Sequence, residues 1–337
     1  LLKPADSQAF LEGKKAYQEA NQAALLKQWR NRCISDGYEP GSTFKTIALM
    51  AAMDDGHVQL NDTLRVWKDG WRYHGATHRD AHAMDTIFTV RQAMATSSNI
   101  ALARIITKAY KGSAKSFVHK LRQMGLTDSI DYIIPGASQA KIQVPKDTVT
   151  ISRMAYGYSV ELSPLQILTI YNAIANNGKM IAPVLVSAIK DGDKDMKTFK
   201  TKVINHSICD EQTLQDIRAC LHDVVWDNEL GTASTGKWRQ QKAQSNLVKI
   251  AGKTGTAQLI ENGKYTSQKH RMSFVGYFPE DNPQYTCICV ISNPRNKGFY
   301  DSGLDCGGVV RRIAESTMIY ASEYVIQGDQ LVLQKKK

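Results

Sequence analysis

Hydrophobic periodicity changes character along this chain of 337 residues. The middle of the chain repeats apolar residues at helical spacing, whereas the last third contains three β-branched or aromatic runs, at 247–258, 271–278 and 285–292. Asn262-Gly263, between the first two runs, is a dipeptide that favours a hairpin turn. Helices followed by neighbouring strands predict an α/β chain of the α+β type, in which helices cover an antiparallel sheet.

The stretch 42–55 has the clearest helical pattern. A Pro-Gly pair at 40–41 precedes it, a wide apolar stripe runs along it, and Gly56 provides a C-terminal stop. We therefore predict a core helix that begins at Ser42. The same periodicity predicts helices at 90–110, 114–125, 163–176, 210–225 and 306–322, and a polar, helix-compatible segment at 5–30.

Charge and cysteine content restrict the classes of partner. The formal net charge of +11 favours anionic partners, although a solvated, lysine-rich surface fits it as well. The sequence has no zinc finger, RNP-like aromatic pattern or basic helical arm, so we expect no nucleic acid partner. The six cysteines form no CxxC pair and are expected to be mostly buried small side chains. No run approaches the ~18 apolar residues of a membrane-spanning helix, and Leu1 resembles a cut inside a longer protein.

A Ser-x-x-Lys motif, Ser42 to Lys45, stands where the predicted core helix begins. Residues three apart share a helix face, so the Lys45 amine can reach the Ser42 hydroxyl. A serine becomes a strong nucleophile only when a base takes its proton, and a buried lysine with a lowered pKa can be that base. Free backbone N–H groups at a helix start can also stabilise an oxyanion. The motif alone is common by chance.

Two further motifs carry hydroxyl, amide and amine groups. Lys253-Thr254-Gly255-Thr256 lies in a strand-like run, where the missing side chain of Gly255 would let a substrate backbone approach and the other side chains suit a carboxylate. For an isolated run of this kind, a strand with a glycine bulge is the better explanation. Ser97-Ser98-Asn99 lies at a predicted helix start, where serine and asparagine are also ordinary N-caps.

Taken in order, Ser-x-x-Lys, Ser-x-Asn and Lys-Thr-Gly resemble the motif set of penicillin-binding proteins and class A β-lactamases. YEPGSTFK, SPLQILTIYNAIANNGKM and GKTGTAQ extend the resemblance over roughly residues 28–325. AYGYSVELSPLQ is more similar to division-type (septal) class B proteins than to elongation-type ones. The resemblance implies a penicillin-binding, β-lactamase-like serine transferase fold with an adjoining all-helical subdomain.

The resemblance also implies a reaction, D,D-transpeptidation. Ser42 would attack the D-Ala–D-Ala carbonyl of a peptidoglycan stem peptide and form an acyl-enzyme, with Lys45 as general base. Ser97 would relay a proton to the leaving amine, and Asn99 would hydrogen-bond the substrate amide and Lys45. The acyl group would pass to an amine of a neighbouring strand, and β-lactams would acylate Ser42 as substrate mimics.

The third motif would hold the substrate. Lys253 and Thr254 would assist the proton relay and bind the terminal carboxylate, Gly255 would lie beside the substrate backbone, and Thr256 would add a hydroxyl. The backbone N–H groups of Ser42 and Thr256 would form the oxyanion hole. The family needs no cofactor and no metal.

The resemblance further implies location, partners and boundaries. The catalytic domain would lie on the periplasmic or extracytoplasmic side of the cell inner membrane, held by an anchor outside this stretch, with cell-division membrane proteins as partners. We predict a transpeptidase domain over 31–325, preceded by a lead-in at 1–30 that lacks the family's opening strand pair, and followed by a tail at 326–337.

Some patterns support other interpretations. His74, His78 and His82, with Asp80 between them, could form a metal-binding face on a helix, but Gly70 and Gly75 interrupt the stretch, so a polar loop near the cleft is favoured.

Two alternatives to the transpeptidase remain open. A β-lactamase would need a hydrolytic base, for which Glu211 is a poor candidate because it lies far downstream on a predicted surface helix. A non-catalytic β-lactam receptor would carry the same three motifs.

Overall fold

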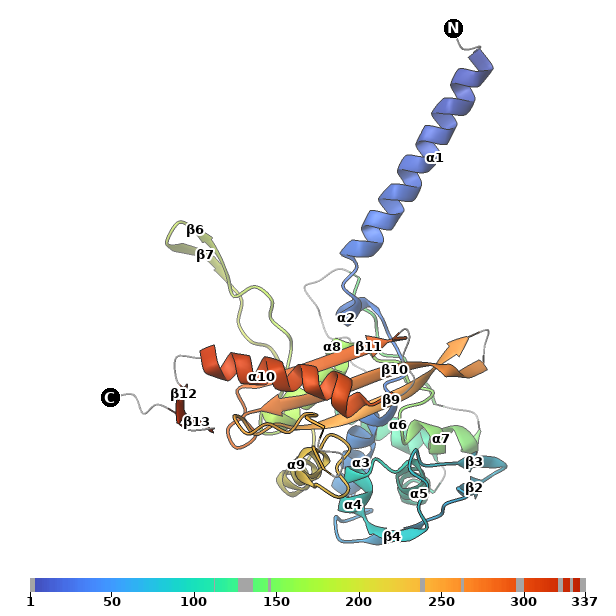
Figure 1. Cartoon of the computed structure of the whole chain (residues 1–337), viewed down its shortest axis with the longest axis vertical. Helices are drawn as coiled ribbons and strands as arrows, with labels where there is room; N and C mark the ends of the chain where they lie inside the picture. The colour runs from blue at the N-terminus through green and yellow to red at the C-terminus, as the bar shows by residue number, and fades with distance from the viewer. Residues whose placement is uncertain are drawn as a thin grey trace.

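A three-stranded antiparallel sheet forms the centre of the protein (Figure 1). The structure is a computed structural model that describes residues 4–111, 113–126, 136–144, 147–236, 240–261, 264–294, 300–320, 324–327 and 330–333. The strands lie in the order β11 (Tyr285–Ser292), β10 (Lys264–Phe278) and β9 (Ala251–Glu261). All three predicted strand runs are therefore confirmed, and the sheet is antiparallel as predicted. Asn262-Gly263 lies outside the described residues, but Glu261 and Lys264 on either side of it are paired.

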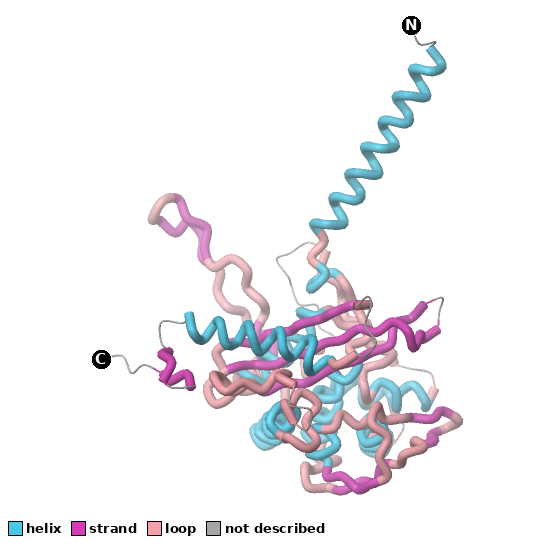
Figure 2. The backbone as a smooth tube through the Cα atoms, in the orientation of Figure 1, coloured by secondary structure: helices cyan, strands magenta, loops and turns pink. Residues whose placement is uncertain are grey.

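Helices lie on both faces of this sheet and form a group below it (Figures 1 and 2). The helices are α1 (Pro4–Trp29), α2 (Arg32–Ser35), α3 (Phe44–Asp54), α4 (Val90–Ala95), α5 (Asn99–Ala109), α6 (Ala114–Gln123), α7 (Thr148–Met154), α8 (Pro164–Ala175), α9 (Glu211–Trp226) and α10 (Gly308–Tyr320). Short antiparallel pairs complete the described elements: β1 (Thr63–Val66) with β4 (Thr86–Thr89), β2 (Trp71–Tyr73) with β3 (Ala76–His78), β5 (Met180–Ile181) with β8 (Val203–Asn205), β6 (Ala188–Asp191) with β7 (Lys194–Thr198), and β12 (Tyr324–Gln327) with β13 (Gln330–Leu333).

The two faces of the sheet belong to two hydrophobic clusters. Alternate side chains of a strand point to opposite faces, so Ile288 and Val290 of β11 pack into the larger cluster with α3 and α8. Cys287 and Cys289 pack into the smaller cluster with α10. The sheet thus carries helices on both faces.

Helix α3 is the centre of the larger cluster. Every residue from Phe44 to Met53 is buried, as expected for a helix that is surrounded by other elements. The predicted core helix is confirmed, with one refinement: Gly41–Thr43 forms a 3₁₀ turn, so regular α-helix starts at Phe44. The predicted helix at 163–176 also holds, because Ser163 and Gln166 form a reciprocal capping box at the start of α8.

Two sequence predictions were wrong. The stretch 90–110 is two helices, because the backbone of Ser97 turns into the left-handed region (φ 59°) between them. Cys33 is exposed rather than buried. The predicted tail at 326–337 contains strand residues of the pair β12–β13, and its boundary remains a prediction.

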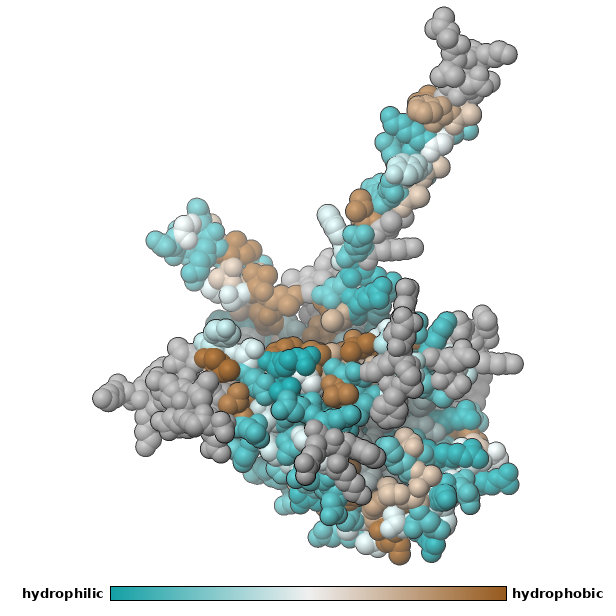
Figure 3. Space-filling view, viewed as in Figure 1, coloured by the Kyte–Doolittle hydropathy of each residue, from teal (hydrophilic) through white to brown (hydrophobic). Residues whose placement is uncertain are grey.

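Helix α1 projects away from the rest of the protein (Figure 1). Figure 3 shows hydrophilic and hydrophobic residues mixed along it, and Phe10 and Trp29 are 67% and 84% exposed. It is long enough to span a bilayer but too polar to do so, and no other helix in the described part of the chain combines the required length and hydrophobicity.

We expect Gly157→Ala to destabilise the protein severely. Gly157 has φ +87°, and a Cβ there would lie 2.2 Å from the carbonyl oxygen of Gly41, in the turn before α3. Neither backbone can yield, so we expect a loss of more than about 4 kcal/mol in the free energy of unfolding, measured by urea denaturation. Gly75→Ala is the matched control, because Gly75 has φ +84° and open space around it. The control should lose only about 1–2 kcal/mol, and an equal loss in both variants would contradict the collision.

Candidate active site

Ser42 lies in the 3₁₀ turn that leads into α3. Gly41 enters this turn with φ +57° and donates its N–H to the carbonyl of Gly157 (3.2 Å). Thr43 Oγ1 donates to the carbonyl of Pro40 (3.0 Å), and the buried Tyr171 hydroxyl donates to the carbonyl of Thr43 (2.9 Å). The turn is therefore held from both sides, while Ser42 itself stays half-exposed.

Strand β9 packs directly against this turn. A Cβ at Gly255 would lie 2.9 Å from Thr43 Cγ2 and 2.5 Å from Ser273 Oγ. From the sequence, Gly255 is predicted to let a substrate backbone approach. The structure gives a different reason, because the protein's own turn occupies the space beside Gly255. The glycine is what allows β9 and the Ser42 turn to touch.

Two buried lysines converge on Ser97. Lys45 Nζ donates to the carbonyl oxygen and to Oγ of Ser97, at 2.5 and 3.1 Å. Lys253 Nζ donates to the same Oγ at 2.9 Å and to the carbonyl of Thr254 at 3.1 Å. Both lysines are completely buried. Members of all three sequence motifs thus meet around one hydroxyl.

The contact predicted between Lys45 and Ser42 is different in the structure. Lys45 lies one turn along from Ser42, but its amine bonds Ser97. Within the described ranges, no hydrogen bond engages the Ser42 hydroxyl. The i,i+3 spacing places the two residues correctly but does not show which group the amine prefers, because Ser97 comes from a distant part of the chain.

Burial makes both amines less basic. It lowers the pKa of Lys45 to about 7, and the carboxylate of Asp80 acts in the opposite direction. Burial also lowers the pKa of Lys253 well below its usual value, and the positive charge of Lys45 lowers it further. A second ammonium would be repelled by the first, so the pair favours at most one positive charge at neutral pH. A neutral amine can accept a proton, and Ser97 Oγ contacts both amines.

Asp80 holds the backbone around Ser97. Its Oδ1 accepts the N–H groups of Asn99 (2.6 Å) and Ile100 (2.9 Å), and its Oδ2 accepts the hydroxyl of Ser98 (2.7 Å). These are free donors at the start of α5, where a carboxylate is favourable. The sequence showed Asp80 only as a polar residue among histidines, so its role as a helix cap was missed.

His78, another member of that polar group, lies in the interior of the protein. His78 is buried, with Nδ1 2.8 Å from the Tyr156 hydroxyl and Nε2 3.0 Å from Ser152 Oγ. Burial, reinforced by Arg153, lowers the pKa of His78 to about 4, so it is neutral at pH 7. Over the described part of the chain, no group of His, Cys, Asp and Glu side chains could hold a metal ion.

Asn99 faces the same loop. Its Nδ2 donates to the carbonyl of Arg79 (2.8 Å) rather than contacting Lys45, as the family resemblance had implied. The amide therefore ties the loop before it to α5. Ser98, which follows Ser97, is the N-cap of α5, so Asn99 is the first residue of that helix.

A row of hydroxyls continues along β9. Thr254 Oγ1 lies 2.7 Å from Thr232 Oγ1, and Thr256 Oγ1 lies 2.5 Å from Ser302 Oγ. Ser302 also donates to the carbonyl of Gly255 (2.7 Å). Thr232 and Ser302 were missed by the sequence analysis, and no local pattern marks either of them.

Two loops bring these hydroxyls to β9. Lys242 Nζ links the two loops, because it pairs with Asp301 (2.9 Å) in one and donates to the carbonyl of Thr232 (3.3 Å) in the other. The edge of β9 therefore presents Lys253 and several hydroxyls together, a set that can hydrogen-bond an anionic group such as a carboxylate.

Comparison with known proteins places these features in one family. The family model described as "Penicillin binding protein transpeptidase domain" matches residues 6–315. The match includes most of α1, which the sequence analysis left outside the domain. The proposed boundary at residue 30 remains a prediction.

Among curated proteins, the chain is 27% identical over 286 residues to the probable peptidoglycan D,D-transpeptidase PenA of Neisseria meningitidis, covering 84% of this chain and 44% of that protein. It is 27% identical over 285 residues to the stage V sporulation protein D of Bacillus subtilis, covering 79% and 40%. The chain thus spans less than half the length of these two relatives.

Solved structures share the fold. Penicillin-binding protein 3 from Mycobacterium tuberculosis, complexed with aztreonam, superposes with a TM-score of 0.73 at 25% identity, covering 91% of this chain and 67% of that one. Penicillin-binding protein 2X from Streptococcus thermophilus gives 0.76 at 23% identity, covering 87% and 43%. With the family model matched over almost the whole chain, this protein belongs to the penicillin-binding protein transpeptidase domain family.

Proposed function

We propose that this domain is a D,D-transpeptidase that cross-links peptidoglycan stem peptides through an acyl-enzyme at Ser42. The observation that carries the proposal is the convergence of Lys45 and Lys253, both buried, on Ser97 Oγ, next to the turn that holds Ser42. A base with a pKa near 7, a proton relay and a half-exposed hydroxyl at a helix start are the parts that acyl transfer needs. Family membership supports the same chemistry.

In the acylation step, the neutral Lys45 amine takes the Ser42 proton as Oγ attacks the D-Ala–D-Ala carbonyl. The backbone N–H groups of Ser42 and Thr256 would bind the oxyanion, a stabilisation of about 3 kcal/mol per donor in other acyl-transfer sites. When the C–N bond breaks, Ser97 passes a proton to the departing amine of D-Ala. The contacts of Ser97 Oγ with both Lys45 and Lys253 supply that route.

In the second step, an amine of a neighbouring strand attacks the ester carbonyl. The new amide bond forms, the bond to Ser42 breaks, and Oγ recovers a proton through the same relay. Lys253 and the hydroxyls of Thr254 and Thr256 would hold the substrate's terminal carboxylate during the first step, and the Asn99 amide would orient the substrate's peptide group. β-Lactams would acylate Ser42 in the same way.

The setting of this reaction is also a proposal. We infer an extracytoplasmic location, because the peptidoglycan substrate lies outside the cytoplasmic membrane. A role in septal synthesis with cell-division membrane proteins is supported by the stretch AYGYSVELSPLQ and by similarity to a protein named peptidoglycan D,D-transpeptidase FtsI homolog from Mesostigma viride.

Incubation with a fluorescent penicillin tests the nucleophile. We expect one covalent adduct, located at Ser42 by peptide mass spectrometry and persisting for many minutes, and no adduct in Ser42→Ala. Adduct loss within seconds would indicate a β-lactamase. A lasting adduct without cross-linking of stem peptides would indicate a receptor, and the absence of any adduct in folded protein would overturn the proposal.

The acylation rate should depend on pH through Lys45. With a pKa of about 7, about a tenth of the amine is neutral at pH 6 and about nine tenths at pH 8. The rate constant for β-lactam acylation should therefore rise roughly tenfold between these values and then level off. Stopped-flow fluorescence measures it, with melting curves at each pH as the folding control. A flat profile from pH 6 to 8 would exclude Lys45 as the base.

Asp80→Asn should shift that profile to lower pH. The Asp80 carboxylate raises the pKa of Lys45 against the effect of burial, so its loss lowers the pKa further and leaves more neutral amine at pH 6. The maximal rate should fall, because the start of α5 is less firmly held. Asp210→Asn is the matched control, because it makes the same change at the N-cap of α9. Asparagine is nearly as good an N-cap as aspartate, so this variant should lose no more than about 0.5 kcal/mol of stability and should not move the profile. An unmoved midpoint in Asp80→Asn would refute the coupling.

A further inference from the structure

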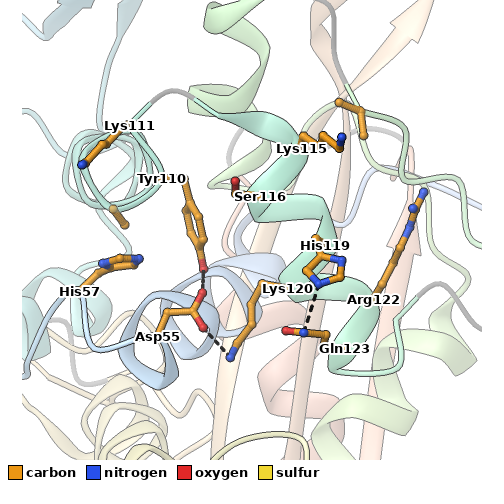
Figure 4. Close-up of a pocket in the computed structure, with 12 residues that line it drawn as sticks. Asp55, His57, Tyr110, Lys111, Lys115, Ser116, His119, Lys120, Arg122 and Gln123 are labelled. Atoms are coloured by element: carbon orange, nitrogen blue, oxygen red, sulfur yellow. Dashed lines mark hydrogen bonds and ion pairs between the residues drawn. The ribbon is translucent and has the colours of Figure 1, made fainter.

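A second concave site lies at the end of α3 remote from Ser42. It is a pocket of about 850 Å³ formed where the C-terminal ends of α3 and α5 meet α6 (Figure 4). Helix α3 has 11 residues, which at 1.5 Å per residue separates its ends by about 16 Å. The pocket is therefore distinct from the candidate active site, and a ligand bound there would not compete for Ser42.

The acidic groups of this pocket share one buried lysine. Lys120 Nζ pairs with Asp54 Oδ2 (2.5 Å) and Asp55 Oδ1 (2.7 Å), and its side chain is only 11% exposed. The buried Tyr110 hydroxyl donates to the other oxygen of Asp55 (2.9 Å). Figure 4 shows Asp55, Tyr110 and Lys120 on one side of the pocket. Lys120 offsets one of the two carboxylate charges, so a single negative charge remains in this group.

Three more cations line the pocket and lack such partners. Lys111 follows the end of α5, Lys115 lies in the first turn of α6, and Arg122 lies in its last turn. All three are exposed, and none makes an ion pair with any residue in the described ranges. Figure 4 shows them at separate edges of the pocket. Positive charges gathered around one cavity attract an anion and favour its binding.

We propose that this pocket binds a phosphate-bearing ligand with at least two negative charges. Lysine and arginine are the usual protein donors to phosphate oxygens, and three separated cations suit a diphosphate or phosphomonoester better than a single carboxylate. Ser116 and Gln123 add neutral donors, and Val144, 43% exposed, gives an apolar wall for the organic part.

The phosphate could belong to a lipid headgroup or to a soluble molecule. The chemistry of recognition is the same, so the two sources are separated by the probe. Inorganic pyrophosphate represents the soluble ligand. Vesicles of phosphatidylcholine in which about a third of the lipid is phosphatidic acid, a phosphomonoester, represent the headgroup.

Isothermal titration calorimetry with pyrophosphate at low salt tests the proposal on the whole chain. We expect saturable binding to the wild type, and at least about tenfold weaker binding after Lys111→Gln, Lys115→Gln and Arg122→Gln are combined. The control combines Lys14→Gln, Lys194→Gln and Lys200→Gln, three exposed lysines on α1, on the hairpin β6–β7 and just after it. It removes the same net charge and should leave binding unchanged.

Several outcomes would overturn the proposal. Absence of binding to both pyrophosphate and vesicles would do so, as would an equal loss in the two triple variants, which would indicate only the overall charge. Binding of citrate as tight as that of pyrophosphate would overturn the assignment to phosphate. Vesicle binding that pyrophosphate displaces would identify a headgroup, and pyrophosphate binding alone a soluble ligand.

The result is independent of the proposed transpeptidase activity. Fluorescent penicillin should label both triple variants at the wild-type rate, because none of the six substituted residues lies near Ser42 or the lysines that contact Ser97. That labelling also shows that the variants are folded.

Discussion

The amines of Lys45 and Lys253 are buried, and both lie within hydrogen-bond distance of the Ser97 hydroxyl. Burial of an amine is unfavourable for its charged form, and the structure compensates by giving each amine a carbonyl as well as the Ser97 hydroxyl. The carboxylate of Asp80 offsets part of the penalty for Lys45. What results is an amine that can be neutral near pH 7, which a solvated lysine cannot be. The chemistry proposed for Ser42 depends on this environment.

The environment itself depends on close backbone approaches. Gly157 supports the turn through Gly41, and Gly255 lets β9 lie against the same turn. Any side chain at these positions would separate Ser42 from Lys253, since one lies on the turn and the other on β9. Ser97 lies between α4 and α5 and has a left-handed backbone conformation. Both its carbonyl and its hydroxyl therefore face Lys45. Local backbone geometry and buried charge therefore form a single constraint.

The sequence allowed the main strands, the core helix and the three motifs to be predicted, because each has a local signature of periodicity, capping or spacing. It could not show what depends on contacts between distant segments. Thr232 and Ser302 reach β9 from loops without a recognisable pattern. Asp80 was visible only beside His78, and its meeting with the start of α5 required the fold. Spacing along the helix predicted a contact between the Lys45 amine and Ser42. Such spacing carries no information about Ser97, which is distant in sequence.

Helix α3 connects the two sites that the structure suggests. The turn at its start carries Ser42, where free N–H groups favour negative charge. Its end carries Asp54 and then Asp55, an unfavourable place for carboxylates beside the helix carbonyls, and Lys120 relieves that repulsion by pairing with both. Lys120 is thereby committed to the fold, so an anion in the pocket must be bound by the other cations. Because α3 is buried on all sides, its ends are held at a fixed separation, and each can be altered without altering the chemistry of the other.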